Sequence, residues 1–237
     1  MTIDRRRFLT ISGASLSAAF LEACNSQGPE SAQRLLRLAE WRNEAVERSL
    51  FRHLSMDRAP AGARAAGRAF PTYYISERVP VWDAAQRGPW ALEVSGLVGR
   101  PLRLSLDELV KVRSVTQRVN HYCVEGWTAV AEWTGVRVSE LARLAQVRPD
   151  AEYVDFVSFD GDYHESWDME SAMHPQTLIA YGMDRRYLGP GHGAPARLHS
   201  PIKLGYKCTK YLTRVVFLPR RNGGYWSDQG YEWFAGV

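Results

Sequence analysis

The pattern of hydrophobic and polar residues changes near position 70 of the chain. Before it, apolar residues recur close to helical spacing over residues 31–56 and predict an amphipathic helix: Leu35, Leu38, Val46, Leu50 and Leu54. Residues 59–67 are mostly Ala, Gly, Pro and Arg, a composition that is typical of a linker. We therefore assign residues 25–69 to a helical extension and linker, and expect the folded body over 70–237.

Short strands and turns are predicted in the body. Residues 90–96 alternate between apolar and other side chains and then meet a turn at 98–101, as a strand does. Ser105 and Ser139 are placed to begin short helices. Further strands are predicted at 115–124, 153–159 and 211–218. Strands and short helices do not alternate regularly, so the predicted class is α+β.

The first residues predict export. Asp4, three arginines, Phe8 and Leu9 precede an apolar run at 11–23 that holds no basic residue. This is typical of a twin-arginine signal over residues 1–24, with an ordinary secretory signal or a buried helix as the alternatives. The twin-arginine translocase carries folded proteins, so the signal predicts a periplasmic or otherwise exported protein whose cofactor is inserted before transport.

The end of this run resembles a lipoprotein processing site. Leu21, Glu22 and Ala23 precede Cys24, and a polar stretch follows. A lipid on Cys24 would tether the protein to a membrane, whereas Glu22 is an unfavourable residue just before the cut, so both outcomes stay open. The run itself is shorter than the about 20 residues of a spanning helix.

Composition narrows the class of protein. A formal net charge of +4 gives no reason to expect nucleic-acid binding, and eight tryptophans favour a packed globular body. Beyond Cys24 the chain has only Cys123 and Cys208. A disulfide framework is therefore excluded, and these two either pair or leave at least one free thiol.

Three segments carry candidate chemistry. Residues 120–127 place Cys123 at the end of a strand beside a glycine turn, where a thiolate can be a nucleophile or a soft metal ligand. Residues 189–197 combine three glycines with Arg197, which suits a phosphate group. Residues 203–210 hold three lysines and suit an anion. His121 shares a strand face with Cys123, so a cysteine hydrolase is one alternative.

Taken in order, these segments resemble the sulfite oxidase family of molybdopterin enzymes. The likeness extends over about residues 70–218 and includes 90–96, 123–127, 132–136, 172–175, 193–198 and 203–207. It implies a fold of mixed sheets with short helices and a molybdenum–molybdopterin cofactor. By this resemblance Cys123 is the thiolate ligand of molybdenum, and the other cofactor-binding residues are Tyr73, Tyr74, Ser158, His192, Arg197, Cys208, Thr209 and Lys210.

The chain also departs from the family pattern. Ser76, Glu77 and Arg78 replace an Arg-Asn-His sequence that sulfite oxidases usually have, and Asn120 and Tyr122 replace arginines. Sulfite is a dianion that favours a cationic pocket, so these changes weaken sulfite as the substrate. Arg118, Arg185 and Arg186 remain as candidate substitutes.

The resulting hypothesis is an oxidoreductase that moves an oxygen atom between a small sulfur- or nitrogen-oxide substrate and molybdenum. Tyr122 and Trp127 are candidates for lining the approach of the substrate, and core packing is the alternative for both. The chain has no Cys-x-x-Cys-His haem motif, so electrons must pass through a separate membrane haem protein or periplasmic cytochrome. The alternative outside catalysis is a cofactor-free binding module.

Overall fold

The computed structural model describes residues 30–50, 56–59 and 70–237, so the signal predicted over 1–24 and most of the linker lie outside the described residues. The chain divides into two units at residues 49 and 50. In the first, α2 (Glu30–Leu50) is a single helix in which Arg48 and Glu44 pair at 2.8 Å. The helix predicted to reach residue 56 does not do so, because residues 56–59 are not helical.

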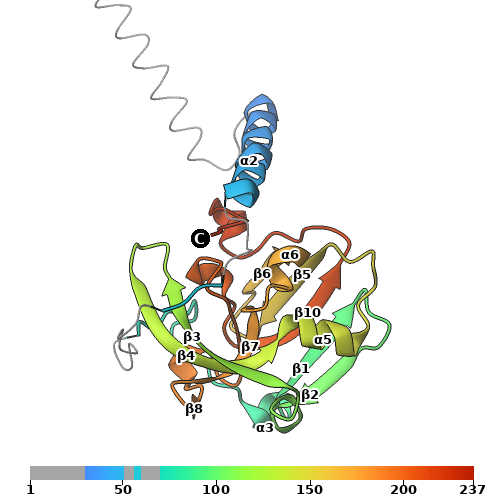
Figure 1. Cartoon of the computed structure of the whole chain (residues 1–237), viewed down its shortest axis with the longest axis vertical. Helices are drawn as coiled ribbons and strands as arrows, with labels where there is room; N and C mark the ends of the chain where they lie inside the picture. The colour runs from blue at the N-terminus through green and yellow to red at the C-terminus, as the bar shows by residue number, and fades with distance from the viewer. Residues whose placement is uncertain (1–29, 51–55, 60–69) are drawn as a thin grey trace, which may run out of the picture. The chain divides into compact units, whose positions relative to one another are not determined.

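The second unit contains one mixed sheet and one antiparallel sheet with short helices, in line with the predicted α+β class (Figure 1). One sheet has the order β2-β1-β10-β5-β6, formed by Leu102–Ser105, Ala91–Gly96, Leu212–Leu218, Tyr153–Ser158 and His164–Asp168. Its β1 and β10 run parallel, and its other neighbours are antiparallel. The first and last strands of the body therefore meet at the centre of one sheet.

The second sheet has the order β3-β4-β7-β8, with β9 also pairing with β7. Its strands are Ser114–Tyr122, Thr128–Arg137, Leu178–Met183, Arg186–Tyr187 and Arg197–His199. The long β3–β4 hairpin keeps one register from Ser114 opposite Val136 to Tyr122 opposite Thr128. This hairpin places Cys123 directly after β3, at the turn.

Short helices close the remaining faces: α3 (Ala84–Arg87), α4 (Leu106–Leu109), α5 (Val138–Ala145) and α6 (Met169–Ala172). Ser105 caps α4 through a capping box with Glu108, as its position predicted. In α5 the buried residues Val138, Leu141, Ala142 and Ala145 recur at helical spacing and face the core. Single 3-10 turns lie at Pro190–His192, Gly205–Lys207 and Ser227–Gln229.

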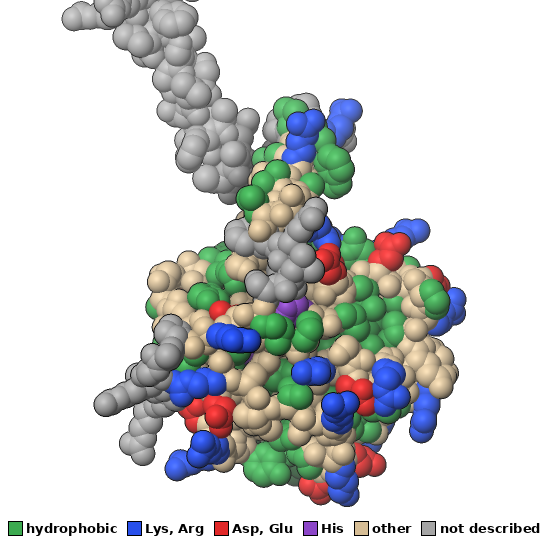
Figure 2. Space-filling model, viewed as in Figure 1, with side chains coloured by type: hydrophobic (Ala, Val, Ile, Leu, Met, Phe, Trp, Pro, Cys, Tyr) green, Lys and Arg blue, Asp and Glu red, His purple; other side chains and the backbone are tan. Residues whose placement is uncertain are grey.

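Two apolar clusters hold these layers together. The larger lies between the first sheet, α4 and α5, and the smaller packs Trp133 and Val119 of the second sheet against Phe70. On the face seen in Figure 2, Lys and Arg side chains are interspersed with Asp and Glu. Among the described residues, every helix is too short or too polar to cross a bilayer.

Candidate functional site

A cavity of about 350 Å³ opens in the second unit. Its walls come from residues 70–75, the turn after β3, the end of β5, the loop before β10 and the segment after β10. Most of the residues singled out from the sequence line it: Tyr73, Tyr74, Cys123, Trp127, Ser158, Arg197, Cys208 and Lys210. Segments separated by more than a hundred positions therefore form one site.

The β3–β4 turn holds Cys123 at one end of the cavity. Its backbone N–H donates to the Trp127 carbonyl at 2.9 Å, and the Gly126 N–H donates to the Cys123 carbonyl at 3.0 Å. The Sγ atom lies 4.0 Å from the Glu125 Oε2, and Cys123 and Cys208 are both free thiols. Burial raises the pKa of the Cys123 thiol. A metal bound there would deprotonate it.

His121 lies beside this end but does not activate the thiol. Burial lowers the pKa of His121 to about 3, so the ring is neutral. Gly205 is required opposite it, because a Cβ there would lie 2.6 Å from the His121 Nε2. No hydrogen bond joins His121 to Cys123 in the described part of the chain. A cysteine nucleophile needs a lowered thiol pKa, so the hydrolase alternative does not fit this geometry.

Two cations also line the cavity: Arg197, which is buried, and Lys210, which is half-buried. Arg197 is 1% exposed and donates to the carbonyls of His192, Leu198 and Cys208, each at 3.2 Å. Lys210 donates to the carbonyls of Tyr73 at 2.7 Å and Gly191 at 2.9 Å. Burial, and secondarily the Arg197 charge, lower the pKa of Lys210 to about 7. No carboxylate of the described residues forms an ion pair with either cation, so this part of the cavity favours an anion.

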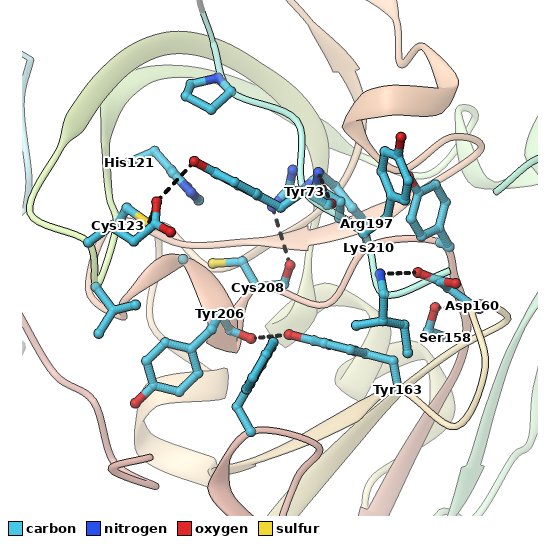
Figure 3. Close-up of a pocket in the computed structure, with 18 of the residues that line it drawn as sticks. Tyr73, His121, Cys123, Ser158, Asp160, Tyr163, Arg197, Tyr206, Cys208 and Lys210 are labelled. Atoms are coloured by element: carbon cyan, nitrogen blue, oxygen red, sulfur yellow. Dashed lines mark hydrogen bonds between the residues drawn. The ribbon is translucent and has the colours of Figure 1, made fainter. Parts of the chain in front are cut away.

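The arrangement fits molybdopterin. In Figure 3, Cys123 lies at one end, Lys210 and Ser158 lie at the other, and Arg197 and Cys208 lie between them. The hydroxyl of Tyr211, which lines the cavity, and the Nδ1 of His121 have no partner among the described residues. The Cys123 thiol could supply one soft ligand to a metal that the cofactor brings with it.

Three predicted site residues lie outside the cavity wall. The hydroxyl of Tyr122 donates to Asp57 at 2.9 Å, and the Asn120 side chain also donates to Asp57. His192 reaches the site through its carbonyl, which accepts from Arg197. Thr209 is fully buried with an unpartnered Oγ1 among the described atoms. The structure thus brings none of these three side chains to the cavity.

The sequence-based prediction for the lysine run is wrong for two of its three members. Lys207 is fully buried and its Nζ lies 2.5 Å from the Glu165 Oε2, while Lys203 lies 3.5 Å from the Asp168 carboxylate. Only Lys210 lines the cavity. The first two lysines are neutralised within the protein and are not available to a ligand.

Several lining residues escaped the sequence analysis: Glu125, Asp160, Tyr163, Tyr206, Tyr211, Trp226 and Tyr231. Asp160 is buried and accepts from the Ile75 N–H at 3.1 Å and from the Ser76 hydroxyl, and so fixes the segment that carries Tyr73 and Tyr74. Its position just after a predicted strand was the one available signal. Arg118, Arg185 and Arg186 do not line the cavity.

Comparison with known proteins also indicates a molybdopterin-binding protein. The family model described as oxidoreductase molybdopterin binding domain matches residues 77–226. The chain is 38% identical over 234 residues to a putative protein-methionine-sulfoxide reductase subunit YedZ1 of Azospira oryzae, covering 98% of this chain and 86% of that protein.

More distant relatives extend the comparison. The chain is 32% identical to the protein-methionine-sulfoxide reductase catalytic subunit MsrP of Ralstonia nicotianae, over 59% of this chain and 46% of that protein. The match thus spans about half of the length of MsrP. Among solved structures, the sulfane dehydrogenase SoxCD of Paracoccus pantotrophus has a TM-score of 0.53 at 23% identity, covering 56% of this chain and 39% of that one. This last likeness concerns the fold.

Proposed function

Because this chain belongs to the family of oxidoreductase molybdopterin-binding domains, we propose that it transfers an oxygen atom and two electrons to or from an organic sulfur compound, most simply as a sulfoxide reductase. Membership makes the chain an oxidoreductase with a molybdenum–molybdopterin cofactor. The names of its relatives point to methionine sulfoxide as the type of substrate. The observation that carries the proposal is that one cavity is lined by the Cys123 thiol and by two cations, Arg197 and Lys210, that form no ion pair with a described carboxylate.

The residues that line the cavity have defined roles in this proposal. Bound in the cavity, molybdopterin supplies a metal that exchanges oxygen and electrons with the substrate. Cys123 supplies the soft thiolate ligand of that metal. Arg197 and Lys210 bind the anionic part of the cofactor, and Tyr211 and Ser158 offer hydroxyl groups to it. Neutral His121 cannot act as a cation toward the substrate.

The mouth of the cavity favours a neutral substrate over sulfite. Its exposed residues are apolar and mostly aromatic, with Tyr73 at 55%, Val124 at 47% and Tyr231 at 41% exposure, and its exposed charged side chain is the carboxylate of Glu125. That carboxylate accepts from the Tyr73 hydroxyl at 2.9 Å and from the Trp127 Nε1 at 3.1 Å. A dianion would meet negative charge there, whereas an uncharged sulfoxide would not.

Three further proposals follow from the N-terminal sequence and the relatives. The protein is exported by the twin-arginine translocase, it exchanges electrons with a separate haem-containing partner, and Cys24 is either cleaved away or lipidated. In a host that cannot make molybdopterin, the precursor should therefore remain in the cytoplasm. A precursor exported equally well without the cofactor contradicts the first of these.

The central test measures molybdenum and turnover together in protein purified from its native host. We expect near-stoichiometric molybdenum and reduction of a methyl sulfoxide with an artificial electron donor. Cys123→Ala should abolish turnover and change the electron paramagnetic resonance signal of the metal. Val81→Ala, which trims an exposed valine that does not line the cavity, is the control. A protein without molybdenum, or full turnover by Cys123→Ala, refutes the proposal.

A further inference from the structure

The segment after β10 folds back over the body as a strap, which we define as residues 223–237. Its first part is fastened to β6, since the Tyr225 N–H donates to the His164 carbonyl at 2.8 Å and the Ser166 N–H donates to the Gly223 carbonyl at 3.2 Å. Its last part is fastened by the Leu204 N–H, which donates to the Ala235 carbonyl at 3.0 Å. Both parts are therefore held in fixed positions.

A buried ion pair sets the position of the strap. The Glu165 carboxylate binds the Nζ of Lys207 at 2.5 Å and also accepts the backbone N–H of Trp226 at 3.1 Å. Gly224 passes so close that a Cβ there would collide with the same carboxylate. Glu165 thus acts as a positioning residue, because it fixes the backbone from which the Trp226 side chain projects.

Two aromatic side chains of the strap reach the cavity. Trp226 and Tyr231 both line it, with ring centroids 5.1 Å apart. Tyr231 also packs edge-on against Tyr206 at 5.4 Å. Tyr73 and Trp127 also line the cavity and stack on each other, with ring centroids 6.3 Å apart. The mouth is therefore bounded by two aromatic groups, and the strap supplies one of them.

Aromatic faces of this kind bind apolar groups and divalent sulfur. The strap residues that line the cavity, Trp226 and Tyr231, carry no positive charge, so the strap offers an anion no partner there. Tyr231 also lies beyond residue 226, where the match to the family model stops. The strap wall is thus partly outside the portion of the chain that the family model describes.

We propose that the strap is the specificity wall of the site, and that Trp226 and Tyr231 bind the apolar substituent carried by the sulfur of the substrate. The preferred substrate is then an organic sulfoxide with an aromatic or extended apolar group. This inference rests on the proposed function, because it assigns the substrate end of the same cavity. Trp226 and Tyr231 are specificity residues, and Glu165 places them.

The test compares two sulfoxides on the molybdenum-loaded enzyme. With Tyr231→Ala and with Trp226→Ala, the KM for methyl phenyl sulfoxide should rise roughly tenfold, while the KM for dimethyl sulfoxide and both kcat values should change by less than roughly twofold. Trp226→Phe should restore most of the discrimination. Tyr187→Ala is the control, because it removes an exposed tyrosine that does not line the cavity.

A binding measurement separates this inference from the proposed function. Methyl phenyl sulfone cannot serve as a sulfoxide substrate, so its Kd for the molybdenum-loaded protein is measured by calorimetry without turnover. We expect the Kd to weaken roughly tenfold in Tyr231→Ala and to be unchanged in Tyr187→Ala. Equal KM changes for the two sulfoxides, or an unchanged sulfone Kd, overturn the strap wall. Failure of the wild-type protein to reduce either sulfoxide while it binds the sulfone overturns the proposed function alone.

Discussion

Two pairs of buried or half-buried cations lie within fourteen positions of each other and have opposite surroundings. Lys203 and Lys207 have acidic partners in Asp168 and Glu165. Arg197 and Lys210 donate to backbone carbonyls and have no ion pair with a described carboxylate. Carboxylates of the protein compensate the charges of the first pair, and this pair fastens the strap. The charges of the second pair have no ion-pair partner among the described carboxylates, so an anion bound in the cavity can compensate them.

The comparison shows that a run of basic residues does not by itself identify an anion site. A buried charge must be compensated, and the location of the compensating group decides its role. Where a protein carboxylate compensates the charge, the cation is structural. Where carbonyl oxygens alone surround it, the remaining charge is available to a cofactor.

The largest effect should come from breaking the buried ion pair between Lys207 and Glu165. Lys207→Met leaves the Glu165 carboxylate buried without its partner, so we expect the free energy of unfolding to fall by about 3–5 kcal/mol. Urea denaturation followed by tryptophan fluorescence measures it. The double variant Glu165→Leu with Lys207→Met should recover much of the loss. A loss below about 1 kcal/mol in the single variant would show that the pair is not what holds the strap.

Removing the unpaired guanidinium should affect the cofactor more than the fold. Arg197→Met removes three hydrogen bonds, which destabilises the fold, and also a buried charge without an ion-pair partner, which stabilises it. Because the two effects oppose each other, we expect the free energy of unfolding of the cofactor-free protein to change by only about 1 kcal/mol. Molybdopterin content after purification should fall roughly tenfold. Arg214→Met, at an exposed position of β10, is the control. Normal cofactor content in Arg197→Met would remove Arg197 from the binding residues.

Lys210 makes the anion end sensitive to pH. Its pKa is lowered to about 7, so in the cofactor-free protein the side chain is charged below that pH and neutral above it. Binding of sulfate, which stays a dianion, should weaken roughly fivefold between pH 6 and pH 8. Calorimetry at the two pH values measures the change. Lys210→Met should show no such dependence, and an equal dependence in that variant assigns the titration to another group.

The smallest expected effect concerns the side-chain hydrogen bond between His164 of β6 and Asp155 of β5. The hydrogen bond to Asp155 raises the pKa of His164 above its unfolded value. A raised pKa adds stability that is complete below the unfolded pKa of about 6.5 and is lost as the pH rises through the folded pKa. His164→Gln should therefore cost about 0.5 kcal/mol at pH 5.5 and less at pH 8.5. Thermal melts at both pH values measure this difference in stability, with Asp162→Asn at an exposed position as the control. A larger cost at pH 8.5 than at pH 5.5 would contradict a stabilising role for protonated His164.

Local signals predicted part of the fold. Residues 90–96, 153–159 and 211–218 were predicted as strands and are found as β1, β5 and β10 within a residue or so at each end. β7 was missed because all of its residues are buried, so no alternation marks it. β4 was missed although its burial alternates, because apolar Val130 between Ala129 and Ala131 and the small Gly135 mask the alternation in the sequence.

Only Cys123 gave a local signal of its own, as a thiol at the end of a predicted strand beside a glycine turn. The glycines around Arg197 are a weak signal alone, and the family resemblance singled out Arg197 and the other predicted residues that line the cavity. Trp226 and Tyr231 gave no signal, because nothing local distinguishes an aromatic residue that lines a cavity from one in the core. The same limit applied to the lysines, whose acidic partners lie about 40 positions away in the sequence.

The central position of β10 also constrains when the protein can mature. β1 and β5 both pair with β10, yet β10 is the last of the described strands to leave the ribosome. Cys208, Lys210 and Tyr211 immediately precede it, so the cavity lacks one wall until this segment has been synthesised. Cofactor loading must therefore wait for the segment that leads into β10.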